Sequence, residues 1–261
     1  MFRIWDDSTG SYVELATRPS IPLRICVHGP SAGAEYGLTY IRVLLVADVL
    51  ARIAELRGLQ VIAVLATDSS PSGALEQHAS ALGIHPPAAH ASPADAEAWL
   101  GGPAAVHVAR TEAGLGDHGR GAVIDVGPVE LTQPEADGQA ADLETAGGDG
   151  HDGLALRLVL LSCSHGQPVE LTQAVLADAG KTLSRWRHQV AEWAREPSRP
   201  IPAETAHKIA IAFDDNLNTV AALAVLDSVE SDDGVPAGAK FETFAFADRV
   251  LGLELVREIG G

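Results

Sequence analysis

Residues 23–30 read LRICVHGP and place an apolar, β-branched run directly before a turn at Gly29-Pro30. This run predicts a buried strand, and apolar residues at helical spacing from Thr39 to Leu56 predict a helix after it. Residues 60–65, QVIAVL, predict a second strand. A strand, a crossover helix and a second strand form the unit from which parallel sheets are built. We therefore expect an α/β fold in the first half of the chain.

The alternation of strands and helices continues toward the middle of the chain and then stops. The further elements that we expect there are helices near 72–82 and 93–100 and strands at 104–109 and 122–125. After Gly153 the apolar spacing is helical throughout, and consecutive helices with short connections form a bundle. The sequence thus predicts a parallel-sheet domain over residues 1–126 and an α-helical bundle domain over residues 154–261.

Residues 127–153, between these two halves, differ in composition from the rest of the chain. They are rich in acidic residues and glycine and contain no lysine or arginine, which is typical of a mobile linker or surface loop. The word PVELTQ occurs at 128–133 and again at 168–173. One repeat of a short word is too little for a repeat architecture. We interpret it as coincidence or as similar helix-entry geometry.

The composition is that of a globular protein with a strong negative charge. Of 261 residues, 46% are hydrophobic and 20% are charged, close to the averages for soluble domains. Lys plus Arg is 18 and Asp plus Glu is 35, which gives a formal net charge of −17. A field of that sign repels nucleic acid, so tRNA is not expected as a partner. A basic stretch at 178–199 also contains acidic residues, which favours a solvated helix face; an RNA contact is the alternative.

The cysteines and the apolar runs indicate where the protein resides. Cys26 and Cys163 each lie inside an apolar run, which fits buried thiols in a reducing compartment better than a disulfide framework. The chain turns acidic soon after Met1, where a secretory signal would be apolar. The longest apolar stretch, 41–54, is interrupted by charged residues and cannot span a bilayer. We expect a cytoplasmic protein with no membrane partner.

Five short blocks lie in fixed order along the chain. They are VHGPS at 27–31, ADVLAR at 47–52, TD at 67–68, LRLVLLS at 156–162 and DDNLNT at 214–219. Their order and sequences resemble the cysteinyl-tRNA synthetase branch of class I synthetases, which includes the mycothiol-pathway cysteine ligase. The resemblance implies a truncated, motif-degenerate paralogue with a Rossmann-like pseudo-catalytic domain and a helical bundle. It also implies that Asp214-Asp215 is structural and anchors a bundle helix.

The residues on which adenylation depends in that family differ in this chain. In an unbroken register, the family's H-I-G-H signature falls on 37–40, which read GLTY. Its K-M-S-K-S signature falls near 121–125, which read GAVID. Both histidines that contact the ATP phosphates are therefore missing, and an aspartate stands where cations belong. Because such groups stabilise charge on the reacting phosphate, we expect ATP binding and ATP-dependent adenylation to be lost.

The resemblance also has a consequence for zinc binding. The family binds zinc with the cysteine of its C-G-P-T motif and with ligands from a long segment, and this segment is absent here between about Trp99 and Val106. His28 occupies the position of that cysteine. Zinc takes about four ligands, and the ten histidines of the chain show no metal-binding spacing beyond His85 and His90. We interpret His28 as a hydrogen-bonded histidine at a strand end, and we expect no bound zinc.

What the resemblance leaves is part of an amino-acid pocket. The candidate ligand-binding residues are His28, Gly29, Ser31, Thr39, Tyr40, Thr67 and Asp68. They predict a binding or partner protein for a small amino-acid-like ligand, and no catalytic residue is assigned. One alternative is an enzyme of altered chemistry that acts on an amino-acid conjugate or adenylate, with His28 or Tyr40 moving protons. Another is a residual ATP-dependent cysteine ligase, which positive charge near the phosphate site would favour; the sequence shows none there.

The junction from Trp99 to Val106 lacks the segment that covers one side of the sheet in the family. It should therefore expose apolar surface, and large exposed patches usually mark interfaces. A twofold homodimer is the simplest closed arrangement of identical chains, and a dedicated protein partner is the alternative. If the acidic segment 127–153 or the bundle covers the gap, the chain stays a monomer.

Overall fold

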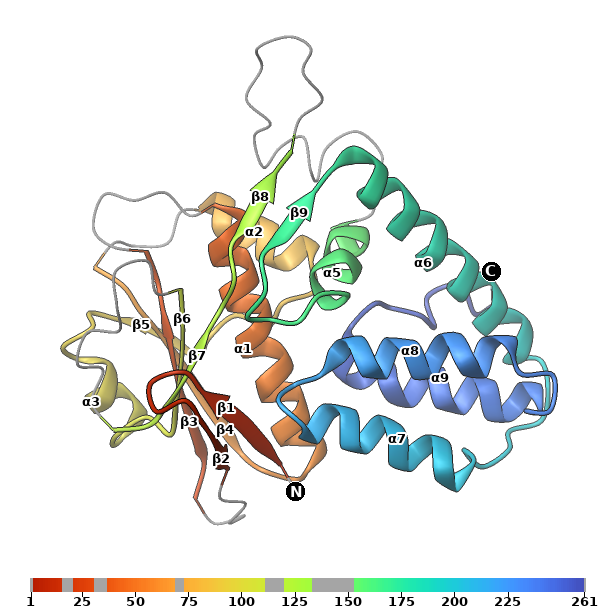
Figure 1. The fold of residues 1–261 in the computed structure, drawn as a ribbon, viewed down its shortest axis with the longest axis horizontal. Coiled ribbons are helices and arrows are strands. Elements are labelled where there is room, and N and C mark those ends of the chain that lie inside the picture. Colours follow the sequence, from red (N-terminus) through yellow and green to blue (C-terminus); the bar gives the residue numbers. More distant parts are fainter. Residues whose placement is uncertain are drawn as a thin grey trace, which may run out of the picture.

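A computed structural model describes residues 2–15, 21–30, 37–68, 73–110, 120–132 and 153–260. Its first half contains a parallel sheet of five strands, and its second half is mainly helical (Figure 1). The strands of this sheet are β3 (Leu23–His28), β4 (Val61–Ala66), β5 (Ala89–Ala91), β6 (Val106–Ala109) and β7 (Ala122–Asp125). The predicted α/β, Rossmann-like class is confirmed.

The order of the strands reverses in the middle of the sheet. The order is β5-β4-β3-β6-β7, so the chain builds outward from β3 to β5 and then returns to the other side of β3. Connections leave β3 and β6 in opposite directions, which opens a crevice at the carboxyl ends of these two strands. Ligands of open α/β sheets bind at this kind of position.

Helices cover both faces of the sheet because side chains along a strand alternate between them. Ile25 and Val27 belong to the main core, which includes α1 (Leu38–Leu56). Cys26, between them, packs with α3 (Ala96–Leu100) on the opposite face. The sequence predicted α1 within one residue at its start and α3 three residues too long there.

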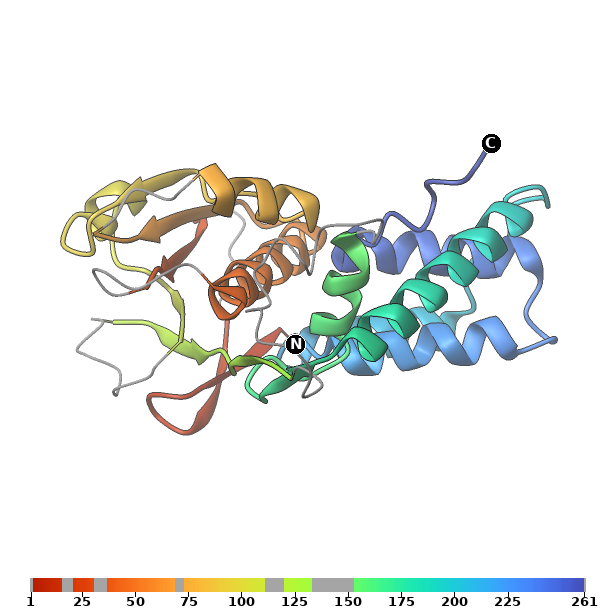
Figure 2. The ribbon, with the colours of Figure 1, turned by 90° about the horizontal axis from the view of Figure 1, so that it is seen from above.

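Helix α1 lies between the sheet and the helical half (Figures 1 and 2). It contacts β3, β4 and β6 on one side and α9 (Ala237–Leu251) on the other. Because both sides are covered, α1 is buried almost all round, and its sequence over 41–54 is mostly apolar. One hydrophobic cluster therefore continues from Ile25 of the sheet to Phe244 of α9.

The remaining helices are α2 (Gly73–Ala81), α5 (Gly153–Leu161), α6 (Gln173–Trp193), α7 (Ala203–Asp214) and α8 (Thr219–Ser231). The helices from α6 to α9 lie side by side (Figure 2). Two tryptophans of α6 meet the ring of Phe244 edge to face, with ring centroids 5.7 Å away for Trp186 and 5.1 Å for Trp193. No helix in the described ranges is long and apolar enough to cross a membrane.

The repeated word at 128–133 and 168–173 proves to be a pair of strands. β8 (Val129–Leu131) and β9 (Val169–Leu171) run parallel, with Val facing Val, Glu facing Glu and Leu facing Leu. The second copy also leads into a helix, because Thr172 caps α6. The expectation of helix throughout after Gly153 is wrong at β9. Of the predicted linker 127–153, residues 128–131 are held by this pairing, and residues 133–152 lie outside the described part. Three-residue strands are too short to show periodicity, which is why the pairing escaped prediction.

Two of the family-like blocks, ADVLAR and LRLVLLS, meet in one buried network of charges. Asp48 accepts hydrogen bonds from Arg52 and Arg157, each over 2.9 Å. Arg157 also donates to the carbonyl oxygens of Leu82 and Leu251. Asp48 and Arg157 have no exposed side-chain surface, so the resemblance in these blocks reflects packing between α1, α5 and the end of α9.

The DDNLNT block joins the helical half to the amino-terminal hairpin, which consists of β1 (Arg3–Asp6) and β2 (Ser11–Glu14). Asp215 pairs with Arg3, with 2.8 Å between the charged atoms, and Asn216 accepts a hydrogen bond from the backbone of Trp5. Asn218 caps α8 by accepting from Ala221 N over 2.9 Å. The structural role that the resemblance implies for this block is confirmed.

Candidate functional site

A cleft of about 430 Å³ opens at the carboxyl ends of β3 and β4. The predicted site residues that line it are His28, Gly29, Thr67 and Asp68. They converge because each directly follows or ends a parallel strand, and parallel strands in one sheet end at the same edge. Helix α3 and β6 complete the walls with Glu97 and His107. The cleft therefore lies at the carboxyl edge of the sheet, beside the point between β3 and β6 where the strand order reverses.

Two of the other predicted residues, Thr39 and Tyr40, lie elsewhere. Thr39 Oγ1 accepts a hydrogen bond from Val129 N over 3.1 Å and thereby holds β8 against α1. Tyr40 is partly buried and packs against the main core. Neither residue belongs to the described lining of the cleft. Ser31 lies outside the described residues.

Three side chains with metal-binding atoms share one face of the sheet in this cleft. Cys26 and His28 stand two residues apart on β3 and therefore point to the same face. His107 of β6 is the register partner of Cys26 and points with it. His28 Nε2 lies 3.0 Å from His107 Nδ1, and the three ligand atoms all lie within 4.8 Å of one another. Thiol and imidazole are the donor types that zinc takes.

Sequence reasoning missed Cys26 and His107 as site residues. The expectation that His28 lacks companions is wrong, although the hydrogen bond expected for His28 is present. A signal did exist, because His107 interrupts an apolar strand and Cys26 shares the two-residue period with His28. Their proximity, however, depends on β6 returning beside β3, which strand patterns alone do not reveal.

The cleft carries negative charge. Among its described lining residues the carboxylates are Asp68 and Glu97, and no lysine or arginine is present there. Burial, together with the charge of Glu97, raises the pKa of the Cys26 thiol to about 11. The thiol is therefore protonated at neutral pH. A cleft with these groups favours a cationic ligand over a polyphosphate.

The segments that align with the two ATP-binding signatures are packed into the fold. Leu38, at the start of α1, is buried, and residues 122–125 form β7, a largely buried strand at one edge of the sheet. Asp7 accepts a hydrogen bond from Asp125 N over 2.8 Å, and burial and the charge of Asp125 raise the pKa of Asp7. One cation does stand at this edge, because Arg110 directly follows β6, and its Nε atom is buried without a hydrogen-bond partner. Sequence reasoning overlooked Arg110.

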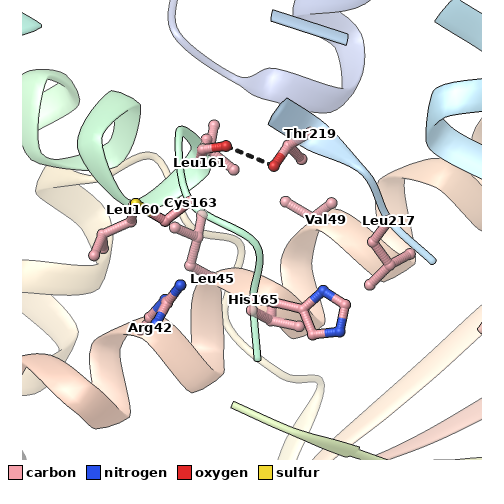
Figure 3. Close-up of a pocket in the computed structure, with 10 residues that line it drawn as sticks. Arg42, Leu45, Val49, Leu160, Leu161, Cys163, His165, Leu217 and Thr219 are labelled. Atoms are coloured by element: carbon pink, nitrogen blue, oxygen red, sulfur yellow. Dashed lines mark hydrogen bonds between the residues drawn. The ribbon is translucent and has the colours of Figure 1, made fainter. Parts of the chain in front are cut away.

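A second, smaller cavity of about 20 Å³ lies between α1, α5 and the turn before α8 (Figure 3). Arg42 lines it and donates to carbonyl oxygens of Gly127, Gln167 and Ser164. Burial lowers the pKa of Arg42 to about 10. The volume admits about one water molecule, so this cavity is part of the packing between the two halves and not a ligand site.

Comparison with known proteins gives one informative similarity. No family model matches the chain. A stretch of 111 residues is 33% identical to the L-cysteine:1D-myo-inositol 2-amino-2-deoxy-alpha-D-glucopyranoside ligase of Streptomyces griseus. This chain is a distant relative of a cysteine ligase. The match covers 41% of this chain and 26% of the ligase, so the chain spans about a quarter of the length of that relative.

Proposed function

We propose that this chain binds a small amino-acid-like ligand in the cleft at the ends of β3 and β4, without activating the ligand with ATP. The observation that carries the proposal is the convergence of His28, Thr67 and Asp68 on one cleft beside the reversal of strand order. Small molecules bind α/β sheets at such positions. The relation to a cysteine ligase supports an amino acid as the class of ligand.

The negative charges of the cleft favour a ligand that carries a protonated amino group. Asp68 and Glu97 are the charged groups of its described lining, and a carboxylate that accepts from an ammonium group forms a charge-assisted hydrogen bond. The same charges oppose a nucleoside triphosphate. With Asp125 at the end of β7, the carboxyl edge of the sheet offers little to bind three phosphates.

A residual ATP-dependent cysteine ligase is the second candidate. The similarity to the Streptomyces griseus ligase favours it. Arg110, which follows the last residue of β6, supplies one cation at the carboxyl edge of the sheet. One guanidinium does not replace two histidines and a cationic loop around a pentavalent phosphate. An enzyme of altered chemistry would use His28 as its proton-transfer group, because Tyr40 packs away from the described cleft.

We do not expect this chain to bind tRNA, and the contacts of the basic residues at 178–199 support that expectation. Arg185 pairs with Glu230, and Lys181 pairs with Asp178 over 2.9 Å. Arg187 is buried and donates to the carbonyl oxygen of Leu253, so the interpretation of this stretch as a wholly solvated face is wrong at that residue. Paired and buried cations contribute little to binding a phosphate backbone.

Calorimetry with cysteine, cysteamine and 3-mercaptopropionate tests the proposed site. Cysteamine keeps the amine and lacks the carboxylate, whereas mercaptopropionate lacks the amine. We expect binding of cysteine and cysteamine but not of mercaptopropionate, and we expect Asp68→Asn to weaken binding about tenfold or more. Asp233→Asn, an exposed substitution in the helical half, is the matched control. Equal binding by Asp68→Asn and the control would contradict the site.

A further inference from the structure

We infer that Cys26, His28 and His107 form a binding site for one zinc ion where β3 and β6 lie side by side. Cys26 and His107 stand outside every block that carries the family resemblance, and the ligands that the resemblance implies come from a different segment. Only the position of His28 is shared. The inference concerns the free protein and does not require the proposed organic ligand.

The distances between the donor atoms fit the ion. Zinc binds imidazole nitrogen at ~2.0–2.1 Å and thiolate sulfur at ~2.3 Å, so a tetrahedral ion holds two nitrogens about 3.3 Å apart and nitrogen and sulfur about 3.6 Å apart. The two nitrogens lie 3.0 Å apart, and all three donor atoms fall within 4.8 Å of one another. Small rotations of the side chains therefore suffice.

The backbone at these positions is held in place. Cys26 and His107 are register partners inside the parallel sheet, and both are buried, with 3% of each residue exposed. Donors on paired strands keep their spacing better than donors on loops. A single ion can thus be bound without rearrangement of the fold.

Zinc binding replaces the hydrogen bond between His28 and His107 with coordination of both side chains, and it releases a proton. The present contact between His28 Nε2 and His107 Nδ1 needs a hydrogen on one of the two nitrogens, and the Cys26 thiol carries its own proton. The ion takes a lone pair from each nitrogen and the thiolate of Cys26. The donating imidazole keeps its hydrogen by moving it to its other ring nitrogen, so only the thiol proton leaves to solvent. Zinc affinity should accordingly increase with pH.

The cleft also suits a cation and leaves it accessible. All three donors line the cleft, so three protein ligands leave a fourth position for water, the arrangement of open rather than closed zinc sites. Glu97 acts on the Cys26 thiol electrostatically, and its negative charge favours a bound cation in the same way.

The test is titration of chelator-treated protein with Co²⁺ followed by displacement with Zn²⁺. We expect one equivalent of Co²⁺, a thiolate-to-cobalt charge-transfer band in the near ultraviolet, and intense visible bands typical of four-coordinate cobalt. Cys26→Ser should remove the charge-transfer band. His28→Gln and His107→Gln should each weaken metal binding about tenfold or more. Cys163→Ser and His188→Gln, which change a cysteine and a histidine outside the site, should titrate like the wild type.

Circular dichroism melts of the metal-free variants separate loss of the site from loss of the fold. If Cys26→Ser fails to fold, His28→Gln at a partly buried position provides a second variant on which the inference can be tested. Titration without a charge-transfer band, or unchanged affinity in His28→Gln, would overturn the zinc site and leave the paired imidazoles as a plain hydrogen bond. Because no organic ligand is present, that failure leaves the calorimetric test of Asp68 unaffected.

Discussion

His165 stands beside Arg42 at the small cavity between α1 and α5, where the two halves of the chain meet (Figure 3). Burial, together with the charge of Arg42, lowers the pKa of His165 from 6.5 to about 4. The folded protein therefore keeps this imidazole neutral at a pH where the unfolded chain protonates it. This makes the packing of the two halves sensitive to acid.

We predict that the free energy of unfolding falls as pH decreases from 6.5 to about 4, the window set by the two pKa values of His165. The sign follows because the unfolded state binds the proton and the folded state does not, so stability is full above 6.5 and is lost on acidification. Urea denaturation at a series of pH values measures it. His165→Gln should flatten the profile in this window, whereas His188→Gln should not. Identical profiles for the wild type and His165→Gln would contradict the assignment.

The buried charges around Asp48 give a second prediction. Asp48→Ala leaves Arg157 buried without its carboxylate, so we expect a loss of about 3–5 kcal/mol in unfolding free energy. Asp178→Ala breaks an exposed pair with Lys181 and should cost less than about 1 kcal/mol. Chemical denaturation compares the two variants. Similar small losses in both would show that the network contributes little to the fold.

Part of the candidate cleft can be predicted from the sequence for a simple physical reason. His28, Gly29, Thr67 and Asp68 end or follow apolar strands, and a parallel sheet gathers such positions at one edge. Cys26 and His107 did not follow, because a side chain inside a strand reveals its neighbours only when the strand order is known. Thr39 and Tyr40 were assigned by alignment to a motif, but their contacts are with β8 and the core.

Helix α8 begins at an N-cap residue of a type that favours helix starts in a sequence. Asn218 precedes the helix, and its side chain accepts from Ala221 N, which satisfies one of the open N–H groups of the first turn. The strand pair β8 and β9 is the opposite case, since each strand has three residues and neither shows a period. The long helices and the strands of the central sheet could be predicted because they span enough residues for a pattern.

We predict that Asn218→Ala lowers the unfolding free energy by about 1 kcal/mol through loss of this cap. Asn218→Asp keeps an acceptor at the same place and should stay within a few tenths of a kcal/mol of the wild type, roughly as cap preferences indicate. Both are measured by denaturant titration. Equal destabilisation by the two substitutions would show that Asn218 acts through another contact.

The surface near residues 99–106 differs from what the sequence predicts. Leu100, Ala104 and Val106 are buried in the α3 side of the sheet or its centre, whereas 62% of Trp99 is exposed. Because Val106 is buried, replacing it with aspartate would disrupt the core and would not report on an interface. An exposed tryptophan is nonetheless a common anchor of interfaces.

We propose that a twofold dimer forms through Trp99 of α3, with a dedicated partner protein as the alternative. Trp99→Glu should convert the dimer to a monomer in sedimentation velocity at micromolar concentration, because it places a charge in a desolvated contact. Tyr12→Glu, at an exposed aromatic residue of the hairpin, should leave the dimer intact. A monomeric wild type would exclude the homodimer.

We propose that this chain binds its ligand without activating it with ATP. Cysteine-dependent exchange of pyrophosphate into ATP measures that activation directly, with the ligand affinity from calorimetry fixing the cysteine concentration. We predict exchange no faster than a protein-free control at saturating cysteine, because the cleft presents Asp68 and Glu97 and no cationic loop in its described lining. Exchange above that control, abolished by Arg110→Ala, would contradict it and identify a residual ligase.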